Sequence, residues 1–168
     1  MPPQMLRRPT FLLPCALLLA ACGTVTNWQE IHTGPMSQAD VYDAVDYLAQ
    51  GDGYLAGPEC DRGLGTWLSR WRQRVLLNNH PARFRLRVEV LIDKGTAQTG
   101  WTILYAVEQQ KVKDLGKSVD PAEADWSADG QDGEREFIFG QRLALRLGVR
   151  KLPGAQGDKT GAPAANSR

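Results

Sequence analysis

Residues that usually build catalytic or metal centres are scarce here, with only three cysteines and two histidines among 168 residues. The two histidines are far apart in the chain, so the zinc-binding pattern of metalloproteases is missing. No Gly-x-Ser-x-Gly motif occurs, and no glycine-rich phosphate loop follows an expected strand. The sequence therefore indicates a protein that acts by binding, without enzymatic activity.

Long apolar runs are also missing, apart from one near the amino terminus. This run extends from Phe11 to Ala21 and follows Arg7 and Arg8. It is much shorter than the roughly 20 residues that a membrane-spanning helix needs. A positive start, a short apolar core and small residues at its end are typical of a bacterial export signal.

Two cysteines, Cys15 and Cys22, lie in or beside this run. Cys15 directly follows Pro14, which does not fit a processing site. The second cysteine completes a motif that resembles the lipobox of bacterial lipoproteins, Leu19-Ala20-Ala21-Cys22. This resemblance implies that the signal is cut before Cys22 and that the thiol of Cys22 carries a covalent lipid. No cofactor is expected besides this lipid, with calcium as an alternative that depends on the segment 125–136.

The resemblance also implies a location in the cell envelope, with the domain outside the cytoplasm. Gly23 replaces the aspartate that retains lipoproteins in the inner membrane, so the outer membrane is expected. Cleavage removes Arg7 and Arg8, which leaves 20 − 2 = 18 basic residues against 19 acidic ones. This balance argues against any general attraction to nucleic acid or to an anionic membrane. Trp28, close to the anchor, is expected at the level of the lipid headgroups.

The chain divides into four expected regions. Residues 1–21 are the signal peptide, and residues 22–36 are the lipidated cysteine with a polar tether. A single domain is expected over 37–152 and a disordered tail over 153–168. Cys60 is the one cysteine left in the domain, so no internal disulfide is expected. Its thiol should be buried and inert, or alternatively free to pair with another chain.

Hydrophobic periodicity predicts two helices in the domain. The first covers 37–51, where Ser37 can cap the helix and Val41, Val45 and Leu48 share one face. The second is expected over 63–79, on an apolar stripe at helical spacing. The members of that stripe are Leu64, Trp67, Leu68, Trp71 and Val75.

Alternating apolar residues predict strands over 84–93 and 101–112, joined by a hairpin loop. The segment 135–150 can be aligned with either pattern. As a helix it would mix arginines into an apolar face, whereas its odd positions from 137 to 149 are almost all apolar, which favours a strand. The expected fold is α+β, with two helices packed on one face of a small, mainly antiparallel sheet of about three strands.

The segment 125–136, DWSADGQDGERE, resembles the calcium loop of EF-hand proteins. Asp132 departs from the pattern, because an apolar residue is usual at that position. A loop of this kind would wrap oxygen ligands around one ion. The ligands would come from Asp125, Ser127, Asp129, Gln131 and Glu136.

Arginines supply a second candidate site. Arg85 and Arg87 should lie on the sheet face away from the helices, and three arginines of the last expected strand, Arg142, Arg146 and Arg150, would join them. Guanidinium groups bind phosphate and carboxylate bidentately, so this face could bind phosphorylated lipid, an anionic wall polymer or an acidic protein surface. Alternatively, Glu89 and Glu108 balance the charge and the face is simply solvated.

The function expected from these patterns is that of a lipid-anchored, non-enzymatic accessory or binding subunit of a cell-envelope assembly. An envelope protein is the expected partner, and the lipid anchor provides the contact with the membrane. Two alternatives remain at this point: an anion- or glycan-binding module that uses the arginines, and a domain stabilised by calcium.

Overall fold

The computed structural model of the protein describes residues 26–76, 80–116, 120 and 122–149. Within these residues the chain forms six strands and two helices, which is an α+β fold in general terms. The strands are β1 (Gln29–His32), β2 (Thr66–Leu68), β3 (Arg72–Val75), β4 (Pro81–Val90), β5 (Thr102–Val112) and β6 (Trp126–Gln131). The helices are α1 (Gln38–Gly51) and α2 (Gly133–Arg146).

Helix α1 forms where the sequence predicts it. Ser37 is its N-cap, and the Ser37 hydroxyl accepts a hydrogen bond from the Asp40 amide at 3.1 Å, which satisfies one of the free donors of the first turn. The expected apolar face, including Val41, Val45 and Leu48, is buried against the sheet.

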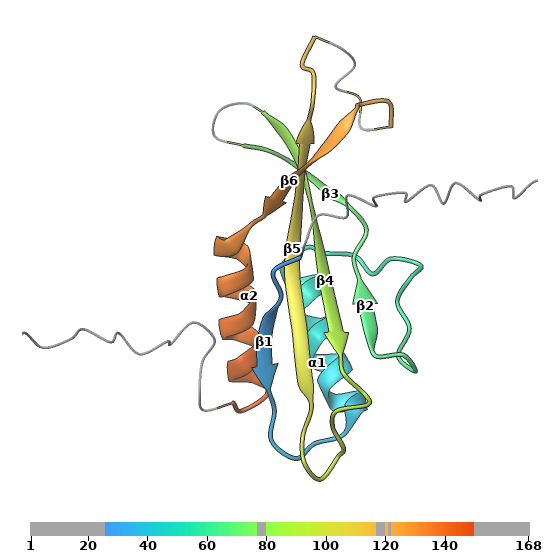
Figure 1. Ribbon diagram of the computed structural model, residues 1–168, viewed down its shortest axis with the longest axis vertical. Helices are drawn as coiled ribbons and strands as arrows, with labels where there is room; N and C mark the ends of the chain where they lie inside the picture. The colour runs from blue at the N-terminus through green and yellow to red at the C-terminus, as the bar shows by residue number, and fades with distance from the viewer. Residues whose placement is uncertain (1–25, 77–79, 117–119, 121, 150–168) are drawn as a thin grey trace, which may run out of the picture.

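The sheet is built around the antiparallel pair β4 and β5 (Figure 1). In this pair Arg85 lies opposite Glu108. Strands β1 and β6 both pair with the other side of β5, and β2 and β3 both pair with the other side of β4. All these pairs are antiparallel. The strands expected over 84–93 and 101–112 are therefore confirmed, with β4 shifted to begin at Pro81.

The prediction of about three strands is wrong, because six strands form the sheet. Two of them, β2 and β3, occupy the segment 63–79, for which the apolar stripe predicts a helix. Ser69 joins them: its amide donates to the Leu86 carbonyl, and its hydroxyl accepts from the Leu86 amide. The segment thus satisfies the backbone groups along the edge of β4, which a helix could not do.

The predicted strand over 135–150 is also wrong, since this segment contributes most of helix α2. Asp132 caps the helix by accepting a hydrogen bond from the Arg135 amide at 3.0 Å. The buried face of α2 differs from the arginine-containing face considered above. Its residues are Glu136, Phe139, Gly140, Leu143 and Ala144. Close packing of these residues on the sheet favours the helix over the alternating strand pattern.

Two more strands lie where the sequence predicts none. Strand β1 falls inside 22–36, the region expected to be a tether, and it pairs with β5 through four residues. Strand β6 falls inside 125–136, the expected calcium loop, and pairs with the far end of β5. Both segments complete the edge of β5.

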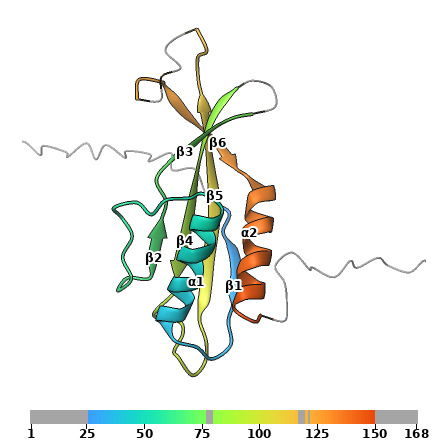
Figure 2. The same ribbon diagram turned by 180° about the vertical axis from the view of Figure 1, so that it is seen from behind.

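Both helices pack on one face of the sheet, and α1 lies in front of the strands in Figure 2. The core lies between the helices and this face. No helix of the described residues covers the opposite face, which we call the open sheet face. Neither of the helices that the structure describes is long and apolar enough to cross a membrane.

Candidate functional site on the open sheet face

Strand β4 gives the open sheet face its positive charge. Every second side chain of β4 is buried in the core, and the intervening ones lie on the open sheet face. This alternation places Arg83, Arg85 and Arg87 in one line. The sequence predicts this position for Arg85 and Arg87, but it misses Arg83 because the expected strand begins at Phe84.

Tryptophan rings stack on these arginines. The guanidinium carbon of Arg83 lies 4.7 Å from the centroid of the Trp71 ring and 4.5 Å from that of Trp126. The centroid of the Trp71 ring also lies 4.5 Å from the guanidinium carbon of Arg85. Each contact is a cation–π interaction. We call the whole set the arginine–tryptophan row: Trp126, Arg83, Trp71, Arg85, Arg87 and Trp28.

The tryptophans of the row come from three separate parts of the chain. Trp28 precedes β1, and the centroid of its ring lies 5.1 Å from the guanidinium carbon of Arg87. Trp71 lies between β2 and β3, and Trp126 begins β6. No local sequence pattern connects these residues, because only the pairing of strands brings them together.

Two glutamates pair with part of the row. The Oε2 atom of Glu108 lies 2.5 Å from Nη2 of Arg85, and its Oε1 atom lies 3.8 Å from Nη1 of Arg87. Glu89 lies 2.9 Å from Arg87. The expectation that glutamates offset the charge of this face therefore holds for two of the three arginines.

Arg83 differs from its neighbours in the row. Its Nε donates a hydrogen bond to the Gln110 side-chain oxygen at 2.8 Å, and no carboxylate of the described residues lies within ion-pair distance of it. Burial lowers the pKa of Arg83, and the nearby charge of Arg85 acts in the same direction. A carboxylate or phosphate placed here would supply the missing counter-charge.

Charge is distributed unevenly along the open sheet face. Glu89 of β4 and Glu30 of β1 both lie opposite Leu104 of β5, which places two acidic residues at one end. Arg83 lies towards the other end of β4, opposite Gln110. We call this second end the cationic end and define it by Arg83, Arg85, Trp71 and Trp126.

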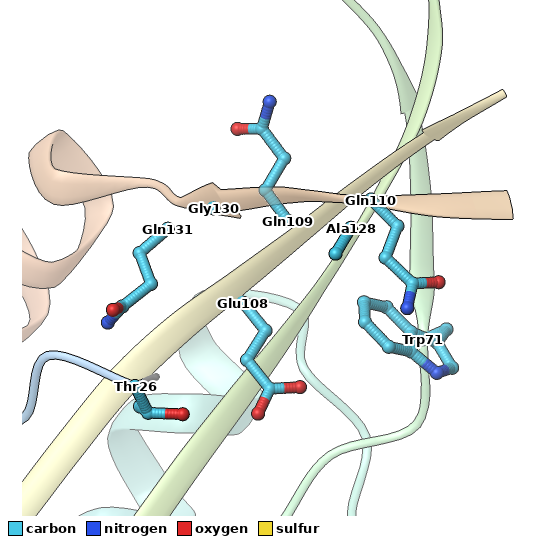
Figure 3. A pocket seen from close by; sticks show the side chains of 8 residues that line it. All are labelled: Thr26, Trp71, Glu108, Gln109, Gln110, Ala128, Gly130 and Gln131. Atoms are coloured by element: carbon cyan, nitrogen blue, oxygen red, sulfur yellow. The ribbon is translucent and has the colours of Figure 1, made fainter. Parts of the chain in front are cut away.

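A cavity of about 50 Å³ lies at the cationic end. Figure 3 shows the side chains of Glu108 and Gln110 on one side of β5, with Gln110 directed towards Trp71, while Gln109 points to the other side. Thr26 also lines the cavity. The described chain therefore begins at the cationic end of the open sheet face.

The other arginines expected at this site lie elsewhere. Arg142 and Arg146 belong to α2, on the opposite side of the sheet, where Arg142 forms an ion pair with Asp52. The guanidinium carbon of Arg146 lies 3.9 Å from the centroid of the Tyr47 ring. The structure therefore does not bring them to the arginine–tryptophan row. Arg150 lies outside the described residues.

The residues of the expected calcium site do not converge on one point. Ser127 and Asp129 belong to strand β6 and Asp125 directly precedes it, whereas an EF-hand site needs a curved loop. Asp129 lies 2.6 Å from the Lys111 ammonium, and a hydrogen bond from Lys111 lowers the pKa of Asp129. The part of the chain that the structure describes contains no group of three or more His, Cys, Asp or Glu side chains suited to a metal ion.

Gln131 and Glu136, the other two expected calcium ligands, form a polar clasp instead. The Gln131 side chain accepts from the Asn27 amide at 2.6 Å and donates to the Asn27 carbonyl at 3.0 Å. It also donates to Glu136 at 2.7 Å. The same Glu136 oxygen accepts from the Val107 amide at 2.8 Å, in the gap that β1 and β6 leave along β5.

The clasp therefore attaches the first described residues firmly to the sheet. Burial raises the pKa of Glu136, although the hydrogen bonds from Val107 and Gln131 act in the opposite direction. Two of the residues in the calcium-like pattern, Gln131 and Glu136, therefore form hydrogen bonds with the backbone of Asn27 and Val107.

Cys22, the expected lipidation residue, is outside the described residues. Cys60 is half-buried rather than fully buried, and its thiol donates to the Leu68 carbonyl at 3.2 Å while its sulfur accepts from the Leu68 amide at 3.3 Å.

The sequence was compared with models of known protein families and with curated proteins, and neither comparison found a match.

Proposed function

We propose that the protein is a lipid-anchored accessory of a bacterial cell-envelope assembly, that it acts by binding without catalysis, and that the cationic end of the open sheet face is its binding surface. The arginine–tryptophan row is the observation that carries this proposal. Tryptophan and arginine are enriched at the energetically important centres of binding surfaces, whereas lysine and glutamate are depleted there.

Arg83 indicates what kind of surface binds at the cationic end. Its guanidinium lies between the rings of Trp71 and Trp126 and is held by Gln110, so its orientation is set before any partner arrives. Preorganised side chains lose little conformational freedom on binding. Because Arg83 lacks a carboxylate partner among the described residues, a partner with an anionic surface fits this site.

The anchor rests on the lipobox-like motif that ends at Cys22. Covalent lipid on this residue would hold the protein at the outer membrane, with the domain outside the cytoplasm, and two or more acyl chains are needed for stable attachment. Mass spectrometry of the amino-terminal peptide of the membrane-extracted protein should show a lipidated cysteine. The Cys22→Ser variant should lose this modification and leave the membrane fraction. An unmodified Cys22 in the membrane fraction would contradict the proposal.

The binding surface can be tested by photo-crosslinking in living cells. Ala128 is exposed and lines the cavity at the cationic end, so a photo-reactive amino acid at this position should capture a bound component. Leu145 of α2 is 78% exposed on the opposite side of the sheet and provides the matched control position. Capture from position 128 and none from 145 is the expected result.

The reverse pattern would overturn the assignment of the surface. Capture from position 145 alone would place the binding surface on the helices. Capture from neither position, by a protein that is shown to be lipidated, would remove the support for binding through the open sheet face.

A further inference from the structure

The clasp limits how far the domain can stand from its anchor. Asn27 is held to the sheet through Gln131, and five residue steps separate it from Cys22. A fully extended chain spans about 3.5 Å per residue, so this connection reaches at most about 17 Å. The sequence predicts a tether that extends to residue 36, and the clasp shortens it considerably.

The connection also determines which part of the domain is nearest to the anchor. Thr26 lines the cavity beside Trp71, and Trp28 stacks on Arg87 of the same face. The lipidated end of the chain therefore leads to the cationic end of the open sheet face. Glu30 and Glu89 lie at the acidic end, away from Thr26.

The side chains at the cationic end are those that favour a membrane–water interface. Tryptophan rings are enriched at the level of the lipid headgroups, and each arginine near an anionic membrane surface adds to its attraction. Arg83 offers a guanidinium without a carboxylate partner among the described residues, and a headgroup phosphate can accept two hydrogen bonds from it.

We infer that the cationic end of the open sheet face docks on the anionic phospholipid headgroups of the membrane that carries the anchor. This inference rests on the proposed lipidation of Cys22 and names the anionic surface bound by the proposed site. The domain then lies against the bilayer with its acidic end and its two helices directed elsewhere. The short connection, the position of Thr26 and the chemistry of the row all support this arrangement.

Tryptophan fluorescence of the lipidated protein tests the docking. The protein is reconstituted in vesicles of phosphatidylcholine, with or without phosphatidylglycerol whose acyl chains carry bromine near the headgroup. Three of the five tryptophans belong to the row, so contact predicts a loss of about half of the emission when brominated phosphatidylglycerol is present. Trp71→Phe and Trp126→Phe should each reduce this loss. Trp101→Phe should not, because Trp101 precedes β5 at the acidic end.

Arginine variants separate docking from stability. Arg83→Gln should lower the ratio of docked to undocked protein about fivefold, because it removes one cation from the membrane surface. Arg146→Gln changes an arginine on α2 and should leave the ratio unchanged. Equal effects of the two variants, or emission that brominated lipid does not quench, would overturn the inference.

The crosslinker at Ala128 distinguishes this inference from the proposed function. A phospholipid adduct on position 128 supports membrane docking and binding through the cationic end, and a protein adduct found beside it supports the accessory role as well. A protein adduct there, with no lipid adduct, keeps the proposed function and overturns membrane docking. If the amino-terminal peptide proves unmodified, the proposed anchor fails, and the inference fails with it.

Discussion

At the scale of single residues, the Glu136 side chain accepts a backbone hydrogen bond that a neighbouring strand would otherwise accept. Its carboxylate lies in the gap between β1 and β6 and binds a backbone amide of β5 that neither strand reaches. A buried amide without a partner is costly, so this side chain allows β5 to be paired by two separate strands. The residue is 4% exposed, and burial raises the pKa of its carboxyl group.

The raised pKa predicts how Glu136 affects stability as pH changes. Folding favours the protonated carboxyl, so its contribution is fully present below the pKa of the unfolded chain and is lost as pH rises through the folded-state pKa. Glu136→Gln has no such titration. Its free energy of unfolding, relative to the unmodified protein, should therefore increase as the pH rises above about 4, the pKa range of an unfolded glutamate.

Urea unfolding at several pH values measures this difference. Any constant offset from the altered hydrogen bond to Gln131 does not depend on pH. Glu134→Gln, at an exposed position of the same helical turn, is the control and should follow the unmodified protein. Parallel curves for Glu136→Gln would show that the carboxyl titrates normally when buried.

Gly140 illustrates close packing between α2 and the sheet. A Cβ atom at this position would lie 1.8 Å from the hydroxyl oxygen of Tyr105. The Tyr105 side chain is fully buried, and this burial raises the pKa of its hydroxyl to about 12. Gly140→Ala should therefore destabilise the protein by about 3 kcal/mol, because the helix or the ring must move.

Thermal or urea unfolding measures this cost, and two further variants identify its cause. Gly133→Ala, in the same helix with open space around the new methyl group, should change stability by less than about 1 kcal/mol. Tyr105→Phe should restore part of the stability of Gly140→Ala, because it removes the clashing hydroxyl. Equal effects of the two glycine substitutions would contradict this account.

At the scale of elements, strand β6 decides between two interpretations of the segment 125–136. Pairing with β5 keeps the backbone of β6 extended, and the Asp129 carboxylate forms an ion pair with Lys111. Calcium should therefore leave the melting temperature unchanged. A calcium-dependent rise that Asp125→Ala abolishes would show that the segment can also form the loop that the sequence pattern suggests.

The boundaries of the strands also explain why the arginine–tryptophan row could not be predicted from the sequence. The alternation of Arg83, Arg85 and Arg87 is a local property of β4. Trp71 reaches the row only because the register on β4 shifts by one residue between Leu68, opposite Arg87, and Arg72, opposite Phe84. Sequence spacing pairs Trp71 with Trp67 on a helix. In the sheet these two rings lie apart, with Trp67 buried in the core and stacked arginines beside Trp71.

At the scale of the whole molecule, the proposed docking should depend on the length of the connection between the domain and the proposed anchor. Inserting a flexible Gly/Ser segment directly after Cys22, so that the connection becomes roughly fourfold longer, should lower the effective concentration of the face at the membrane about eightfold. Quenching by brominated phosphatidylglycerol should fall accordingly, while lipidation and membrane fractionation stay unchanged. Quenching that does not depend on this length would contradict a docking controlled by the anchor.

The sequence by itself determined the features whose causes are local. Ser37 and the apolar face after it specify α1, and the alternation of β4 assigns its two faces. The anchor that the lipobox-like motif predicts stays a prediction. Only the tertiary structure decided the segments 63–79 and 135–150. Their local patterns fit helix and strand respectively, but the open edge of β4 and the close approach of Gly140 to Tyr105 favour the opposite choice.

The same distinction applies to the candidate site. Arg85 and Arg87 were predictable because neighbouring residues of one strand share a face. The stacking of tryptophans on them and the clasp between Asn27 and Gln131 were not, because their energy depends on partners far away in the chain. A single sequence shows which side chains are present, whereas the pairing of the strands decides which of them meet.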